Sequence, residues 1–452
     1  MREIYTPEVF YFILMLGTFI FLAAIKIPIG VSLMFSALAG AIAFGEFFPV
    51  RHLVEGAFGY IDTMLIIATA MIFMASIKHS GLLDTLAKKM ALGLKNQPTL
   101  LLVLMTFFIM IAGMITGSST ATVLTTGAIS YPVLKSMNLS KKKAGAIIAM
   151  AGIYGMIAPP VNLPAMIIGQ GVDMPYIGFT PPLLLLTFPL AIVSSLVIAG
   201  NQLKPVNVDE LAIEDIPSSN FAIYLPAIVM IILMVLENVG ILSLGLPLIF
   251  IISAILATFT GRKGNIFKTS VEAMRDSLGI LSILAGVGMF IQIMTLNGVR
   301  GMIVGFLNGL PSEILLIGIA IGIPLFGAVS SYGSASVLGV PFLLAFLGGN
   351  DIVVCSALSL LAGLGDMVPP TALAGIFAAH IVGEKNYFKV WVAGLPSFFI
   401  TMVYATFVIA NSKSFGKFVE GNSFYPVFFI GLAILFVLFI IFDKFKIRRQ
   451  TT

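Results

Sequence analysis

Long apolar runs, separated by short polar stretches, recur along the whole chain. Many of them are long enough to cross the hydrocarbon core of a bilayer, which takes about 20 residues of helix. The runs lack the strict alternation of apolar and polar residues that marks the strands of a membrane β-barrel. Since only helices and closed barrels satisfy their backbone in lipid, the pattern predicts an all-α polytopic membrane protein.

Two of the apolar runs carry a similar interruption near their middle. Small hydroxyl residues break the first at Thr116–Thr122 (TGSSTAT) and the second at Ser330–Ser336 (SSYGSAS). A proline follows each kink, and a Pro-Pro pair breaks another apolar segment 27 residues after that proline in the first case and 28 in the second. Repeated, broken hydrophobic helices are typical of a transporter whose site lies where the two repeats meet.

The runs and their breaks divide the chain. We expect N-terminal scaffold helices in residues 1–62, a first repeat in 63–200, a cytoplasmic linker in 201–220, further scaffold helices in 221–277, a second repeat in 278–411, and an extra C-terminal helix with a basic tail in 412–452. Re-entrant hairpins are expected at 99–135 and 312–348, and broken helices at 144–170 and 352–382. Residues 261–276 are interpreted as a basic loop. Length alone leaves open whether each interrupted run is one hairpin or two full spans.

Charge adds an orientation to this layout. Hydrophobic residues make up 59% of the 452 residues and charged ones 10%, so the net charge of +5 reflects membrane orientation and not nucleic-acid binding. If both hairpins enter and leave on one side, 20 of the 25 lysines and arginines share a face. The positive-inside rule places that face and the C-terminus in the cytoplasm, and the N-terminus outside. The two repeats are then inverted.

A helix break inside a bilayer exposes backbone N–H and C=O groups. Such a break persists only where protein, water or a ligand supplies hydrogen-bond partners. The N-terminal ends of half-helices suit a carboxylate or phosphate, and C-terminal carbonyls with nearby hydroxyls suit Na⁺. For the substrate we expect contacts from Ser118, Ser119, Thr120, Asn162, Ser334, Ser336 and Thr371. For Na⁺ we expect ligands at Gly117, Ser119, Thr122, Pro159, Ser331, Gly333, Asp366 and Pro369.

Asp366 is the one acidic residue well inside a predicted apolar segment. An ionised carboxylate is costly there, so a functional role is the first interpretation. The residues alone leave three roles open: a cation ligand, a proton carrier, or a brace for unwound backbone. The hydroxyls have a plain alternative too, because Ser and Thr often bond back to their own helix.

At these residues the chain resembles a known family. Gly117–Ala121 (GSSTA) and Ile157–Gly169 (IAPPVNLPAMIIG) are similar to motifs of the large membrane subunit of TRAP (tripartite ATP-independent periplasmic) transporters. The likeness covers roughly residues 10–410 and is most specific in the first half, while Ser330–Ser336 and Asp366 depart from the usual pattern. It implies an elevator-type, Na⁺-driven importer of organic acids in the bacterial inner membrane, fed by a periplasmic binding protein and paired with a small four-helix membrane subunit.

Other classes fit less well. A standalone cation- or proton-coupled carrier of the same superfamily stays open, and a channel does as well, because broken helices also build filters. An intramembrane protease would need a Ser-His pair or two aspartates, and His380 and Asp366 are the only inner candidates. The single cysteine excludes an intramolecular disulfide, and the chain lacks a GxxxxGK[ST] phosphate-binding motif. We therefore expect no enzyme activity and no organic cofactor.

Overall fold

The computed structural model describes residues 6–206, 221–238, 240–262, 264–346, 349–421 and 423–451. Within these ranges all regular secondary structure is helical, which confirms the predicted all-α class. Seven of the described helices are long and apolar enough to cross a membrane. They are α1 (Pro7–Ala24), α4 (Ile61–Ser80), α6 (Pro98–Thr116), α11 (Thr180–Ala199), α14 (Ile266–Leu296), α21 (Tyr387–Ala410) and α23 (Phe424–Thr451).

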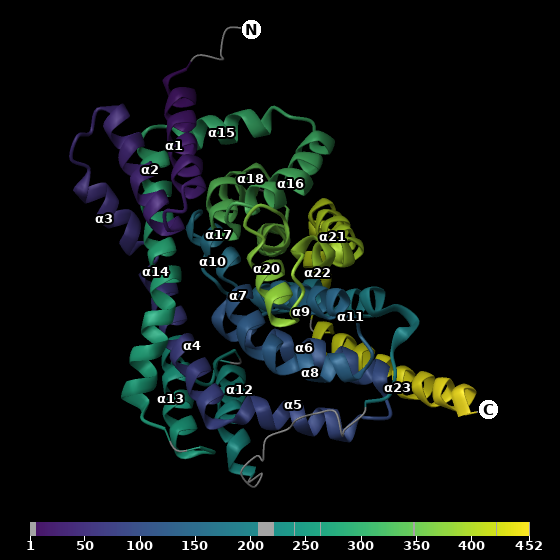
Figure 1. Ribbon diagram of the computed structural model, residues 1–452. Helices are drawn as coiled ribbons and strands as arrows, with labels where there is room; N and C mark the ends of the chain where they lie inside the picture. The colour runs from purple at the N-terminus through teal and green to yellow at the C-terminus, as the bar shows by residue number, and fades with distance from the viewer. Residues whose placement is uncertain are drawn as a thin grey trace.

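One group of helices, called the scaffold group below, surrounds the long helix α14 on the left of Figure 1. It contains α1, α4, α14, α2 (Ile29–Phe44), α3 (Val50–Phe58), α12 (Leu225–Asn238) and α13 (Leu246–Phe259). Helices α2, α3 and α4 pack against α14, and α13 packs against α4 and α12. Glycines permit the closest approach: a Cβ on Gly56 of α3 would lie 2.8 Å from the carbonyl carbon of Gly288 of α14. Small residues at such crossings are typical of membrane helix pairs.

A second group, called the transport group below, is built from both interrupted segments. It contains α6, α11, α21, α7 (Ser119–Thr122), α8 (Ala128–Ser136), α9 (Lys141–Ile157), α10 (Leu163–Gln170), α16 (Ser312–Gly327), α17 (Ser331–Ser334), α18 (Val340–Ala345), α19 (Asp351–Leu364), α20 (Leu373–Ile381) and α22 (Ser412–Val419). Helix α9 lies at its centre, packed against α6, α11, α20 and α21. Two short helices connect the groups: α5 (Leu82–Gly93) crosses the bottom of Figure 1, and α15 (Val299–Asn308) crosses the top.

The two ends of the first interrupted segment lie close together. The backbone N–H of Lys204 donates to the carbonyl of Met137 (3.2 Å), and the N–H of Val206 donates to the carbonyl of Lys95 (3.0 Å). The extended segment at 203–206 therefore links the residues just before α6 with those just after α8. This arrangement agrees with a hairpin that enters and leaves on one face. The inverted relation between the two repeats stays a prediction.

The prediction of a basic loop at 261–276 is wrong for most of that stretch. Helix α14 already begins at Ile266, and Asn265 caps it by accepting a hydrogen bond from the N–H of Phe267 (3.0 Å). The charged residues of this stretch lie on the end of a helix, where long side chains can reach water while their stems cover apolar surface. The predicted boundary at 277/278 thus falls inside a continuous helix. Most of the predicted linker, residues 207–220, lies outside the described residues.

Candidate substrate and cation site

The tips of the two interrupted segments have the same local construction. After α6, Gly117 adopts a left-handed conformation (φ 62°), which favours glycine. Ser118 then starts the second arm, and its side chain accepts a hydrogen bond from the N–H of Ala121 (3.2 Å). In the other segment Ser330 plays the same capping role and accepts from the N–H of Gly333 (3.0 Å). A serine therefore caps the start of both second arms.

The matching continues beyond the tips. Both second arms pass through a π-helical turn, at Val123–Gly127 and at Ala335–Gly339. Such turns are rare and frequently lie at functional sites. Both Pro-Pro breaks, at Pro159-Pro160 and at Pro369-Pro370, contain a cis peptide bond. The two copies of the sequence pattern, each an interrupted segment followed by a broken helix, thus share backbone features that their residue types alone do not display.

The first Pro-Pro break is held by contacts to two other helices. The N–H of Val161 donates to the carbonyl of Met114 in α6 (3.1 Å). Asn162 is fully buried, and its side-chain oxygen caps α10 by accepting from the N–H of Ala165 (2.9 Å). Its side-chain amide also donates to the hydroxyl of Ser359 in α19 (2.8 Å). Asn162, a predicted substrate contact, therefore joins the first break to the second broken helix.

The second Pro-Pro break follows the 3₁₀ turn Gly365–Met367, which ends the first half of its broken helix. Thr371, another predicted substrate contact, donates from both its N–H (3.2 Å) and its hydroxyl (2.5 Å) to the carbonyl of Ala328 near the second tip. The hydroxyl of Tyr387 in α21 donates to the carbonyl of Met367 (2.6 Å). Protein groups therefore satisfy much of the backbone that the break frees.

Residues from both tips and the second break meet at Asp366. The carboxylate is buried, with 4% of the residue exposed, and the Ser119 hydroxyl donates to its Oδ2 atom. The Ser331 hydroxyl interacts with the same carboxylate. Beside them, the hydroxyl of Tyr332 in the second tip donates to the carbonyl of Gly117 in the first (3.1 Å). The structure thus brings together four of the predicted cation ligands: Gly117, Ser119, Ser331 and Asp366.

Other predicted site residues form hydrogen bonds within their own hairpins. This agrees with the alternative interpretation that Ser and Thr side chains bond back to their local backbone. Their hydroxyls donate to backbone carbonyls: Thr122 to Ser118 (2.7 Å), Ser336 to Gly333 (3.0 Å), and Ser334 to Ile323 (2.7 Å). A hydroxyl that donates in this way keeps lone pairs for a cation or a further donor. Of the remaining candidates, Pro159 is buried, and Thr120 and Pro369 are half-buried.

Three side chains around the breaks were not predicted. Tyr332 lies inside the second kink, but only serines and the glycine of that motif are predicted site residues. Ser359 and Tyr387 lie in other segments, and only the tertiary structure brings them to Asn162 and Met367. The aromatic residue within a polar kink was the one signal that could have pointed to Tyr332.

The donor set around Asp366 consists of oxygen atoms. Among the residues that the structure describes, no group of three or more His, Cys, Asp and Glu side chains could hold a metal ion. One carboxylate with hydroxyl and carbonyl oxygens is instead the kind of donor set that a hard cation prefers. The arrangement therefore suits a hard cation better than a transition metal.

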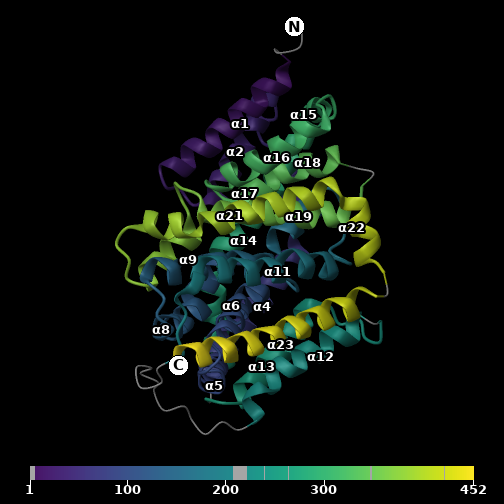
Figure 2. The ribbon, with the colours of Figure 1, turned by 90° about the vertical axis from the view of Figure 1, so that its right-hand side faces the viewer.

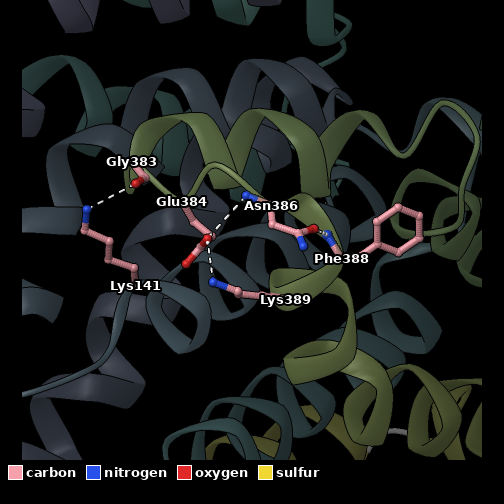
Figure 3. Close-up of polar contacts among 6 residues, drawn as sticks. All are labelled: Lys141, Gly383, Glu384, Asn386, Phe388 and Lys389. Atoms are coloured by element: carbon pink, nitrogen blue, oxygen red, sulfur yellow. Dashed lines mark hydrogen bonds and ion pairs between the residues drawn. The ribbon is translucent and has the colours of Figure 1, made fainter.

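A polar cluster outside the apolar region ties the start of α9 to the loop before α21 (Figure 3). Lys141 donates to the carbonyl of Gly383 (3.1 Å), and Glu384 accepts from the N–H of Asn386 (3.2 Å) and pairs with Lys389 (3.4 Å). The N–H of Asn386 is the main reason why the pKa of the Glu384 carboxyl lies below its usual value, and the charges of Lys389 and Lys141 add to it. The cluster thus joins the start of the first broken helix to the segment that follows the second.

A helical membrane protein with two hydroxyl-rich kinks, two Pro-Pro breaks and a buried carboxylate between them has the features of a secondary transporter. Comparison with known proteins agrees. Residues 16–414 match the sequence model of the family described as "Tripartite ATP-independent periplasmic transporter, DctM component". The chain belongs to this family, which confirms the resemblance seen in the sequence. Membership supports a multi-pass inner-membrane transporter and argues against an enzyme.

The individual proteins that this chain resembles share between 14% and 30% sequence identity with it. The isethionate TRAP transporter permease protein DctMQ of Oleidesulfovibrio alaskensis is 30% identical over 151 residues, which span 32% of this chain and only 23% of that relative. The solved YdaH transporter of Alcanivorax borkumensis is 15% identical with a TM-score of 0.61, over 91% of this chain and 99% of that one. MtrF of Neisseria gonorrhoeae, described with a class of antimetabolite efflux pumps, is 14% identical with a TM-score of 0.60, over 90% and 95%. At such identities the two structures support the fold alone.

Proposed function

We propose that the protein is the large permease subunit of a TRAP-type system, which takes up a small organic acid across the inner membrane with Na⁺ as the driving ion. The observation that carries the proposal is the buried Asp366 carboxylate, which interacts with a hydroxyl from each hairpin tip. An ionised carboxylate at such a place needs a counter-charge. A bound Na⁺ would supply it, and the surrounding oxygens would complete its coordination.

The same tips could hold the anionic substrate. The second arm of each hairpin begins at a tip, at Ser119 and at Ser331, so the positive end of each helix dipole lies there. A substrate carboxylate at this position would gain from the positive ends of these helices and from the nearby cation. Coupling would follow, because a site that holds a cation and an anion together binds each better than either alone.

An elevator mechanism fits the division into two groups of helices. The transport group holds both kinks and both breaks, and the short helices α5 and α15 connect it to the scaffold group. Direct contact between the groups includes the hydroxyl of Tyr60, which donates to the carbonyl of Ile167 in α10 (3.0 Å). A rigid movement of one group past the other would exchange such contacts while leaving the site intact.

The partners follow from the family. TRAP systems use a periplasmic binding protein and a small membrane subunit, and we propose both for this chain. The match to a permease named for isethionate, a small organic sulfonate, agrees with an organic anion as substrate. A carboxylate is the substrate class that we favour, because the family resemblance implies organic acids, and helix N-termini and hydroxyls suit such an anion.

Uptake into proteoliposomes tests this function. The purified chain, reconstituted with the small membrane subunit and the periplasmic binding protein proposed above, should take up one member of a panel of labelled organic acids. We expect saturable uptake that requires an inward Na⁺ gradient and stops when an ionophore collapses it. Uptake without the binding protein would indicate the standalone carrier, and uptake that rises linearly with concentration would indicate a channel. Either result would overturn the TRAP-type assignment.

A further inference from the structure

The C-terminal helix α23 lies beyond the part of the chain that matches the family, which ends at residue 414. It is apolar and long enough to span a membrane, yet only 6% of the residues in the 18-residue apolar window within Phe424–Lys444 are buried. A helix with so little buried surface owes its position to few contacts. Those contacts therefore decide with which part of the molecule it moves.

One of these contacts is made by Asp443. This residue is fully buried, and its carboxylate accepts hydrogen bonds from the N–H of Thr99 (3.2 Å to Oδ1 and 3.0 Å to Oδ2) and from that of Leu100 (3.2 Å to Oδ2). Both N–H groups lie in the first turn of α6. The residue before that helix, Gln97, provides no side-chain cap. Asp443 therefore acts as the N-cap of a helix that begins 345 residues earlier in the chain.

A carboxylate suits this position for two reasons. It satisfies N–H groups that have no partner within the helix, and its charge opposes the positive end of the helix dipole. Hydrogen bonds to an ionised acceptor are also roughly twice as strong as those between neutral groups. Since Asp443 is shielded from water, the attachment of α23 at this end is firm.

Aromatic contacts lead to the same helices. Phe436 of α23 lies against Phe107 of α6, and Phe428 lies against Phe188 of α11, with ring centroids 6.2 Å apart in both pairs. Helices α6 and α11 are the main neighbours of α23, and Figure 2 shows α23 crossing just below α11. Both neighbours belong to the transport group, as does α22, which precedes α23 in the chain.

We propose that Asp443 is a positioning residue that fastens α23 to the first arm of the first hairpin, so that α23 moves with the transport group. This inference rests on the proposed elevator movement. During this movement α23, which lies outside the part of the chain that matches the family, is carried through the bilayer with the transport group. It does not stay with the scaffold group. The lipid around α23 must then rearrange in every transport cycle.

Distances between spin labels test the inference without a known substrate. Cysteines would replace three exposed residues in a Cys355→Ala background: Ile255 of α13 in the scaffold group, Val193 of α11, and Val437 of α23. Pairs of labels would be measured in lipid nanodiscs, in NaCl and in choline chloride. We expect one narrow α11–α23 distance in both salts. The α13–α23 distances should instead show the same spread or shift as the α13–α11 distances.

Three results would overturn the inference, and they have different meanings. A narrow α13–α23 distance beside a variable α11–α23 distance would show that α23 stays with the scaffold. A narrow, unchanged α13–α11 distance would contradict the elevator movement itself. Asp443→Asn should broaden the α11–α23 distances, whereas Asp84→Asn, the same change at an exposed position, should not. If Asp443→Asn leaves them narrow, Asp443 is not the positioning residue.

Discussion

Asp366 joins segments that lie far apart in the chain: Ser119 precedes it by 247 residues, and Ser331 belongs to the other hairpin. Next to this contact, Tyr332 connects the two tips through the carbonyl of Gly117. Any change in the charge on Asp366 would therefore reach both tips at once. Such a link is what coupling requires in the proposed mechanism, because ion binding must alter the place where the substrate binds.

Glu384 should make stability depend on pH in the acid range. The Asn386 N–H and the nearby lysines hold its pKa below that of the unfolded chain. Its ionised form therefore contributes stability above the unfolded-state pKa, and this contribution is lost as the pH falls through the folded-state pKa. We expect Glu384→Gln to flatten the fall in melting temperature below about pH 4.5. The control is Glu46→Gln at an exposed carboxyl; equal slopes in both variants and the parent would contradict the assignment.

Part of the site could be predicted at this scale. Asp366, Ser119 and Ser331 are predicted site residues because a buried charge and an interrupted helix are costly in a bilayer unless they have a function. Their mutual contact could not be predicted, since it depends on how the hairpins pack. Tyr332 and Asp443 were missed for a related reason. The sequence around a tyrosine in a motif, or around an aspartate at the end of an apolar run, gives no sign of its contact with a residue far away in the chain.

The predicted ends of the interrupted segments agree closely with the structure, because the residues that mark the ends of a helix are local signals. Helix α6 begins at Pro98 and α8 ends at Ser136, each one residue from the predicted hairpin at 99–135. The π-helical turns after both tips had no visible signal, because they differ from α-helix only in their hydrogen bonding. Helix α14 extends through most of the predicted loop at 261–276, because charged residues at the end of a helix have the same composition as a polar loop.

Close packing of α6 on α9 depends on glycine. A Cβ on Gly155 of α9 would lie 2.6 Å from the carbonyl oxygen and 2.8 Å from the Cα of Met110. Gly155→Ala should therefore lower the stability by about 1–3 kcal/mol through overpacking. The matched control is Gly318→Ala in α16, where nothing lies within 4 Å of the added methyl group. Thermal unfolding in detergent would compare the two; equal melting temperatures would show that the interface yields at no cost.

For the whole molecule, the charge distribution predicts an orientation. The loop before α9 and the C-terminus should lie in the cytoplasm, and the N-terminus outside. Cysteines at Ser140 and Thr451 should resist a membrane-impermeant thiol reagent in intact cells, whereas one at Thr6 should react. The native Cys355 is fully buried and should not interfere. Labelling of the Ser140 position from outside would show that the first interrupted segment is not a hairpin with both ends inside.

Thermal unfolding in two salts tests most directly whether a cation binds at Asp366. A ligand that binds only the folded protein stabilises it by RT ln(1 + [Na⁺]/Kd), about 2.7 kcal/mol at 100 times the Kd. We expect the parent protein to melt at a higher temperature in NaCl than in choline chloride of equal ionic strength. Asp366→Asn should lose this difference, and Asp443→Asn, a buried change at the opposite end of α6 from the first tip, should keep it. Equal melting temperatures of the parent in both salts, or an undiminished Na⁺ effect in Asp366→Asn, would contradict the account.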